Sequence, residues 1–232
     1  GATLGAVPAV EDYFSRIREI CDRHDVLLIL DEVMAGRGRT GAWFGFEQEA
    51  IRPDIVTVAK GLGGGYQAIG ATICRPHIHD AIVEGSGFFE HGHTYIGHAT
   101  ACAAALAVAR VIEQQQLLDA VQSTGQQLKH GLDALLTEHP RVGDIRGRGL
   151  FLGIELVADR TTRKPINGRL GLPARIKKEA MKNGLIVYPG GGTADGIDGA
   201  HVLLAPPFTY SASHVDELLN KLGRTLNGVS YE

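Results

Sequence analysis

Two short apolar runs stand out in the pattern of hydrophobic and polar positions near the start of the chain. Residues 26–30 are all apolar and lead into Asp31, and residues 55–59 are apolar apart from one threonine and lead into Lys60. Such runs, without polar alternation, are typical of strands buried on both faces of a parallel sheet. Because ligands bind beyond the carboxyl ends of these strands, we expect Asp31 and Lys60 side by side at the functional edge of the sheet.

The rest of the first half alternates between helical and strand patterns. We expect a helix beginning at Pro8, a third strand at 69–74, and a long helical region over 99–139 with breaks near Gln116 and Gly125. Alternating helices and strands are typical of an α/β fold. This part, residues 1–115, is therefore predicted to be one domain with a mainly parallel sheet.

Beyond Pro140 the elements become shorter. The pattern predicts a hairpin over 145–157 turning on Gly147 and Gly149, a helix over 173–183, strands at 185–188 and 201–205, and a helix over 213–226 with Ser213 as its N-cap. Mixed short strands and helices indicate a smaller α+β domain. Residues 116–232 are predicted to form it.

Charge and cysteine content limit the classes of partner. The 232 residues include 23 basic and 26 acidic side chains, a balance that favours neither nucleic acid nor a membrane surface as partner. The three cysteines are few and far apart, which favours a reducing compartment. The sequence predicts neither a signal peptide, in which basic residues precede an apolar stretch, nor an apolar helix long enough to span a bilayer. A cytoplasmic protein that acts on small molecules is expected.

The candidate chemistry rests on Lys60 and Asp31. A lysine at the end of a buried strand, followed by Gly61 and Gly63–65, is expected to be partly desolvated, which favours a neutral amine able to attack a carbonyl. A buried carboxylate needs a cationic partner, and a protonated pyridine nitrogen would serve. This pairing makes pyridoxal phosphate a candidate cofactor. The alternative is a Lys60–Asp31 ion pair without a cofactor.

Two other glycine- and histidine-rich segments suggest different chemistry and are set aside. Residues 63–68 match a dinucleotide-binding fingerprint, but a strand is expected after them where that motif needs a helix. His91, His93 and His98 lack a second cluster of ligands, so loop histidines are favoured over a metal site.

Several motifs, in order and at the right spacing, resemble those of class III pyridoxal-phosphate-dependent aminotransferases. The resemblance covers essentially the whole chain and rests on Asp31-Glu32-Val33 and on residues 36–41, 54–65, 93–99, 146–150 and 205–208. It implies fold type I, in which a large domain with a mainly parallel sheet precedes a smaller C-terminal α+β domain.

The resemblance also implies roles for individual residues. It assigns Lys60 to the Schiff base with pyridoxal phosphate and Asp31 to the pyridine nitrogen. Val33 would pack on one face of the ring, and Met34 would lie beside the ring hydroxyl. Thr94 would bind the cofactor phosphate of the neighbouring subunit, so a homodimer with shared active sites is implied.

Three positions bear on the substrate and on departures from the family. Many members have Gln at the position of Met34 and a carboxylate-binding Arg at the position of Tyr188. With Tyr188 there, an α-carboxylate must find another cation, or the amine donor lacks one. Arg148 is a second candidate for the substrate side; its alternative is a structural pairing with Glu155.

The resemblance predicts amino transfer from an amine or amino acid to an oxo acid such as pyruvate. The same apparatus serves racemases, aminomutases and decarboxylases, and an inactive scaffold is a further alternative. Family members are roughly twice as long, so this chain is expected to begin inside the large domain. Without the first strands and the phosphate-binding turn, we expect weak or no turnover and an open sheet edge.

Overall fold

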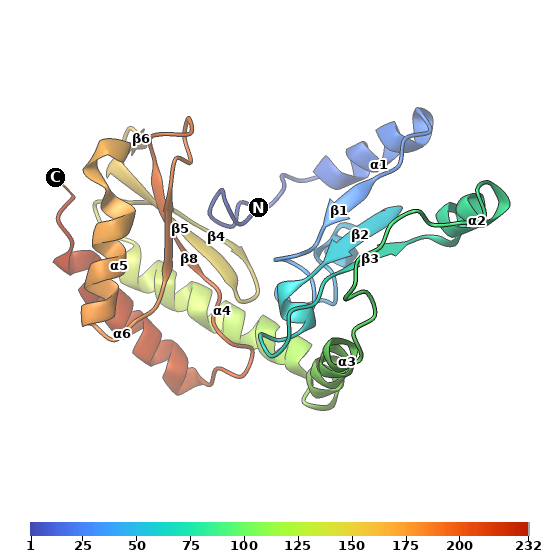
Figure 1. Cartoon of the computed structure of the whole chain (residues 1–232). Coiled ribbons are helices and arrows are strands. Elements are labelled where there is room, and N and C mark those ends of the chain that lie inside the picture. Colours follow the sequence, from blue (N-terminus) through green and yellow to red (C-terminus); the bar gives the residue numbers. More distant parts are fainter. Residues whose placement is uncertain (232) are drawn as a thin grey trace. The chain divides into compact units, whose positions relative to one another are not determined.

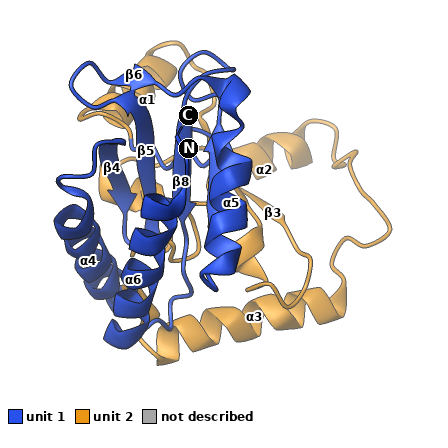
Figure 2. Cartoon of the chain, turned by 90° about the vertical axis from the view of Figure 1, so that its left-hand side faces the viewer, with its two compact units in different colours: residues 1–8, 119–232 blue, residues 9–118 orange. Residues whose placement is uncertain are grey.

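The computed structural model describes residues 1–231, and the chain divides into two compact units. Unit 1 comprises Gly1–Pro8 and the chain from Asp119 onward, and unit 2 is Ala9–Leu118 (Figure 2). The boundary after Leu118 falls close to the predicted division at residue 115, but the first eight residues pack with the C-terminal part. The assignment of functional domains stays a prediction.

Unit 2 contains a three-stranded mixed sheet. Its elements are α1 (Tyr13–Arg23), β1 (Ile29–Asp31), η1 (Gly45–Glu49), β2 (Ile55–Val58), η2 (Lys60–Leu62), β3 (Ala71–Cys74), α2 (Pro76–Glu84) and α3 (Ala99–Gln114). The strand order is β1-β2-β3, with β1 parallel and β3 antiparallel to the central β2 (Figure 1). The expected strand pair is therefore present, and the third strand runs the other way.

The burial expected for this sheet is only partly observed. Val56 and Val58 of the central β2 are buried, but Ile29 of β1 is 57% exposed and Ile73 of β3 is 48% exposed. The prediction of a strand buried on both faces is thus wrong for β1. An apolar run gives a strand the capacity for burial, whereas burial itself needs another element over each face, and β1 and β3 are the edges of this sheet.

The first helix also differs from its prediction. It begins at Tyr13 rather than at Pro8, after Asp12 in the left-handed conformation (φ 62°). The left-handed backbone at position 12 interrupts the helical path, so the residues before it are not part of α1. The segment Gly1–Pro8 belongs to unit 1 instead, where Arg146 Nε donates to the carbonyl of Gly5 at 2.9 Å.

Unit 1 is an antiparallel sheet with helices packed on it. Its elements are α4 (Leu117–Leu136, beginning just before the unit boundary), β4 (Val142–Arg148), β5 (Phe151–Asp159), β6 (Lys164–Pro165), η3 (Gly168–Leu170), α5 (Leu172–Lys182), β7 (Tyr188–Gly191), β8 (Ala200–Leu204) and α6 (Ala212–Gly228). The strand order is β4-β5-β8-β7, and β6 pairs with β5. Helices α4, α5 and α6 supply core residues such as Leu128, Ile176 and Leu222, which pack with Ile154 and Val202 of the sheet.

The long helical region breaks once rather than twice. The predicted break near Gln116 is confirmed, since α3 and α4 are separated there and Gln116 has φ 51°. The predicted break at Gly125 is wrong because α4 runs through it. A Cβ at Gly125 would collide with the backbone of Gly149 in the turn between β4 and β5. The glycine thus allows close packing and does not end the helix.

Smaller differences concern the last elements. The hairpin, the helix ending before Gly184 and the strand near His201 are confirmed. The strand expected at 185–188 instead begins at Tyr188, whose partner in β8 is Leu203. The last helix is capped by Ser211 rather than Ser213. No helix among the described residues is long and apolar enough to cross a membrane.

Candidate active site

The parallel register of β1 and β2 brings Asp31 and Lys60 to the same edge of the sheet. Asp31 is the last residue of β1 and pairs with Thr57, and Lys60 follows the end of β2 two residues after Val58. The pairing continues one residue further, because Glu32 N–H donates to the carbonyl of Thr57 at 2.9 Å. The carboxyl ends of both strands therefore present one acid and one amine at the position predicted from the sequence.

The backbone at Lys60 is unusual. Lys60 opens the short helix η2 with φ 44°, in the left-handed region that favours glycine. A non-glycine residue in that region costs roughly 1–2 kcal/mol, and such residues cluster at functional sites. The next side chain is that of Leu62, since Gly61 carries none, and three glycines, 63–65, follow.

The Asp31 carboxylate is oriented by its own turn. Its Oδ1 accepts the N–H of Val33 at 2.9 Å, which ties the side chain to the peptide that follows it. Val33 and Met34 are half-buried in this turn. Asp31, Val33 and Met34, three of the predicted cofactor-binding residues, thus lie in one turn.

The expected desolvation of this pair is not observed. Asp31 and Lys60 are both exposed to solvent. The reason is the one seen in the outer strands: unit 2 places nothing over this edge of its small sheet, so side chains that leave it meet water. The prediction that the acid and the amine are buried is therefore wrong for this chain, whereas both do lie at one edge of the sheet.

Sequence reasoning missed the residue between Asp31 and Val33. Glu32 is only 4% exposed, and burial raises the pKa of its carboxyl above the usual value; the N–H groups of Gly45 and Phe46 oppose that shift. The sequence offered one signal: Glu32 follows an apolar strand and Asp31 directly. An acid in such a place is ordinarily interpreted as a solvated loop residue.

The segment after Glu32 folds into an ordered loop that carries two arginines. The Arg37 guanidinium lies over the ring of Trp43, 4.6 Å from its centroid, as a cation–π contact. Burial lowers the pKa of Arg39 to about 10. The loop therefore holds positive charge close to the chain that follows Asp31.

The histidine-rich loop over 85–98 contains Thr94 and connects α2 to α3. Thr94 is exposed in this loop, and its predicted phosphate contact stays a prediction. Two of the histidines have local roles: His93 Nδ1 accepts the N–H of Tyr95, and His98 Nδ1 caps α3 by accepting the N–H of Ala101, each at 3.3 Å. Among the described residues, no group of three His, Cys, Asp or Glu side chains could hold a metal ion.

Tyr188 and Arg148, the residues predicted for the substrate, belong to unit 1. Tyr188 begins β7 with 69% of its side chain exposed, and Arg148 ends β4. Glu155 forms an ion pair with Arg146 at 2.5 Å, and Arg146 lies diagonally across from it in the register of β4 and β5. The alternative of a structural pairing for Arg148 stays a prediction. A role for Tyr188 and Arg148 in substrate binding stays a prediction.

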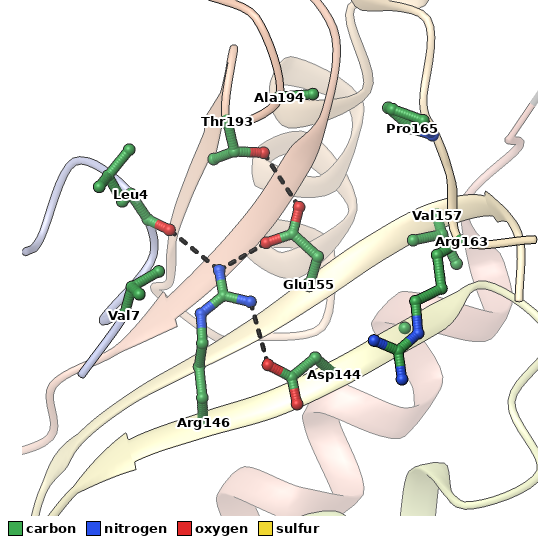
Figure 3. A pocket seen from close by; sticks show the side chains of 11 residues that line it. Leu4, Val7, Asp144, Arg146, Glu155, Val157, Arg163, Pro165, Thr193 and Ala194 are labelled. Carbon is green, nitrogen blue, oxygen red and sulfur yellow. Dashed lines mark hydrogen bonds and ion pairs between the residues drawn. The ribbon is translucent and has the colours of Figure 1, made fainter. Parts of the chain in front are cut away.

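Unit 1 also contains a cavity of about 390 Å³ beside the N-terminal segment (Figure 3). Figure 3 shows Arg146 between Asp144 and Glu155, with Thr193 donating to Glu155 at 2.9 Å and the carbonyl of Leu4 accepting from Arg146 at 2.9 Å. The Arg146 guanidinium thus forms ion pairs with the carboxylates of Asp144 and Glu155. None of the predicted site residues lines this cavity.

The residues at the edge of unit 2 fit pyridoxal phosphate. Lys60 offers an amine for its aldehyde, Asp31 an acceptor for its ring nitrogen, and Val33 an apolar surface for the ring. The glycines after Lys60 leave room for a ligand to approach the backbone. These are residue types that the cofactor requires, and the strand register brings them to one sheet edge.

Comparison with known proteins decides the family. The model of the class III aminotransferases matches residues 2–226. The chain belongs to this family. An aminotransferase of Gibberella zeae is 43% identical over 96% of the chain, and the hypotaurine/taurine–pyruvate aminotransferase of Paracoccus denitrificans is 34% identical over 97%. Among solved structures, an aminotransferase of Bacillus anthracis superposes with a TM-score of 0.90 at 36% identity over 97% of the chain.

This class III aminotransferase chain spans about half the length of the relatives it matches. It covers 44% of the Gibberella protein, 49% of the Paracoccus protein and 50% of the Bacillus structure. The fold expected from the resemblance is confirmed: the solved neighbours are transaminases of fold type I, and the chain corresponds to their C-terminal portion. Its α/β architecture contains mixed sheets.

Proposed function

We propose that this protein transfers an amino group from an amine or amino acid to an oxo acid, with pyridoxal phosphate as cofactor. The observation that carries the proposal is the register of β1 and β2, which delivers Asp31 and Lys60 to one sheet edge. The bound cofactor supplies an electron sink for the negative charge that develops at the substrate carbon. Family membership supports the same reaction class.

Lys60 has two roles in this proposal. Its amine would hold the cofactor through the cofactor's aldehyde. The same amine, when free, would act as the general base and acid that moves the proton of the substrate carbon. The backbone at Lys60 is left-handed, and the residue after it is glycine.

Asp31 holds a proton on the ring nitrogen. A hydrogen bond from a protonated ring nitrogen to a carboxylate contributes roughly 1.5–3 kcal/mol. Such a bond would keep the ring cationic. The bond from Val33 N–H occupies Oδ1 of Asp31 and fixes the direction of the carboxylate. Val33 would contact the ring face, Met34 would lie beside the ring hydroxyl, and Thr94 would bind the phosphate of the cofactor held by a partner subunit.

We further propose that turnover requires a region equivalent to the other half of the relatives. The relatives are about twice as long, and apolar side chains of the unit 2 sheet such as Ile29 and Ile73 are about half exposed. Additional strands on this sheet would bury these side chains, and they would desolvate Lys60. The active form is expected to be a homodimer.

The amine donor is expected to lack an α-carboxylate, and pyruvate is the expected acceptor. Tyr188 offers a hydroxyl and an aromatic ring where many family members have an arginine, so β7 supplies no cation at that position. The Paracoccus relative is named for a sulfonate or sulfinate amine as donor and for pyruvate as acceptor. These names and the residue at 188 point in the same direction.

The test is the visible absorbance of the full-length gene product loaded with pyridoxal phosphate. The unchanged protein is expected to show the band of the covalently held cofactor, and Lys60→Ala to lose it because no amine remains at that edge. Lys177→Ala removes an exposed lysine on α5 and serves as the matched control, which should retain the band. Retention of the band in Lys60→Ala would refute the assignment.

A panel of amines with pyruvate and 2-oxoglutarate then identifies the half-reactions. Amines without an α-carboxylate should be converted faster than amino acids with pyruvate as acceptor. Tyr188→Arg should improve the use of α-carboxylate substrates, because it adds the missing cation. If wild type prefers α-amino acids, the donor class proposed here is wrong.

A further inference from the structure

Glu32 differs from its exposed neighbour Asp31 in burial and in what it binds. Its carboxylate is buried and accepts two backbone N–H groups of η1: Oε2 from Gly45 and Oε1 from Phe46, each at 3.0 Å. The bonds span 13 and 14 residues of chain. Both oxygens of one carboxylate are therefore used to join the end of β1 to the start of a distant helix.

The main chain of Glu32 is fixed as well. Its N–H donates to Thr57 of β2, and its carbonyl accepts the N–H of Gly36, each at 2.9 Å. A Cβ on Gly36 would lie 2.7 Å from that same carbonyl oxygen, so the turn after Glu32 is tightly closed. Donor, acceptor and side chain of one residue are thus held by three separate segments: β2, the turn at Gly36 and η1.

These anchors act on the peptide that orients Asp31. The Asp31 carboxylate accepts the N–H of Val33, and Glu32 is the residue between them. If the side chain of Glu32 lost its hold on η1, the turn would lose one of its anchors, and the peptide that carries the Val33 N–H would depend more on the bond from Gly36 to the Glu32 carbonyl. The Asp31 carboxylate that this N–H orients would then be held less firmly. Site residues need support of this kind, because errors of roughly 0.5 Å in a ligand-holding group already matter.

We propose that Glu32 is a positioning residue, which aims the Asp31 carboxylate at the cofactor nitrogen by tying the turn after β1 to η1. The proposal rests on the proposed function. It predicts that the charge of Glu32 matters and not only its volume, because two N–H donors converge on its two oxygens. A neutral amide of the same size can accept only one of them and turns its own donors toward the other.

The experiment compares Glu32→Gln with a matched control in the full-length gene product. Glu47 also caps η1, by accepting the N–H of Phe44 at 3.3 Å, but it is exposed, whereas Glu32 is buried and accepts the N–H groups of Gly45 and Phe46. Glu32→Gln should weaken cofactor binding roughly 10- to 100-fold, the range found for residues that orient metal ligands. Glu47→Gln should leave the cofactor dissociation constant within about twofold of wild type, as expected for an exposed site.

Hydrogen exchange of the protein without cofactor gives a readout that does not depend on activity. In Glu32→Gln, the amides of residues 33–46 should exchange faster than in wild type, while those of β2 keep their protection. Glu32→Asp retains the charge but reaches only one N–H, so it should fall between wild type and Glu32→Gln. It also keeps the test open if Glu32→Gln does not fold.

A double-mutant cycle with Asp31→Asn separates positioning from general stabilisation. If Glu32 acts through Asp31, Glu32→Gln should change cofactor affinity little once Asp31 is already Asn; two independent effects would add. Additive effects, or unchanged affinity in Glu32→Gln and Glu32→Asp, would overturn this proposal and leave the proposed function standing. Failure of wild type to bind the cofactor would overturn the two together.

Discussion

The two compact units of this chain differ in how completely each buries its own apolar residues. The main core cluster lies entirely in unit 1, between Val121 and Val229, and many of its side chains are fully buried. In unit 2 the strands are just as apolar, yet Ile29 is 57% exposed and β3 is exposed along its length. Both units therefore contain apolar strands, but unit 1 covers most of its sheet, whereas in the unit 2 sheet the buried side chains are those of Val56 and Val58 in β2.

The two units also differ in which of them contains the main core and which contains the candidate active site. Unit 1 has a dense core, and unit 2 carries the acid and the amine at an exposed sheet edge. Lys60, with its left-handed backbone, also lies in unit 2. The unit that buries less of its own apolar surface thus holds the candidate active site.

The sharpest test of this comparison is a pair of leucines in helices. Leu222 on α6 of unit 1 is 0% exposed, and Leu106 on α3 of unit 2 is 52% exposed. Leu222→Ala should reduce the free energy of unfolding by about 2–5 kcal/mol, because it leaves a cavity in a core that cannot collapse freely. Leu106→Ala should cost about 0.5 kcal/mol or less. Urea denaturation of this chain measures both, and equal losses would contradict the comparison.

A smaller effect tests how densely unit 1 is packed. A Cβ at Gly125 would meet the backbone of Gly149, so Gly125→Ala should destabilise by about 1–3 kcal/mol, although alanine is the better helix former. Gly131, on the same helix, faces only the flexible end of Leu219. Gly131→Ala should therefore be nearly neutral in thermal denaturation. A stabilised Gly125→Ala protein would show that the helix and the hairpin turn do not pack so closely.

The smallest effect concerns acid sensitivity of unit 1. His201 is 2% exposed between Gly5 and Gly190, and neither ring nitrogen has a hydrogen-bond partner among the described residues. Burial lowers the pKa of His201; Glu155 opposes this shift and Arg146 adds to it. Because the folded state disfavours the charged ring, stability should fall as pH drops through 6.5, by at most about 1.4 kcal/mol per pH unit.

His201→Leu removes this titration and should flatten the pH dependence of the free energy of unfolding between pH 7 and 5, a window set by the ordinary value of 6.5. His130→Leu, at an exposed position on α4, is the control and should leave the slope unchanged. An unaltered slope in His201→Leu would place the sensitivity elsewhere.

Much of the fold and of the site could be read from local pattern. The order of elements, the break at Gln116, the hairpin on Gly147 and Gly149 and the placement of Asp31 and Lys60 at strand ends all follow from periodicity and turn residues. These features depend on neighbours in sequence, which is why one sequence was sufficient for them. The prediction at Gly125 failed because the residue that requires this glycine, Gly149, is far away along the chain.

The family, most of the elements and the two residues proposed for the chemistry follow from the amino-acid sequence, because motif spacing and hydrophobic period are local properties of the chain. Only the folded structure shows which apolar runs are buried, that the first eight residues pack with the C-terminal unit, that Arg146 pairs with Glu155, and that Glu32 ties the end of β1 to η1. Each of these depends on which distant segments meet, and a pattern along the chain carries no record of its partners in space.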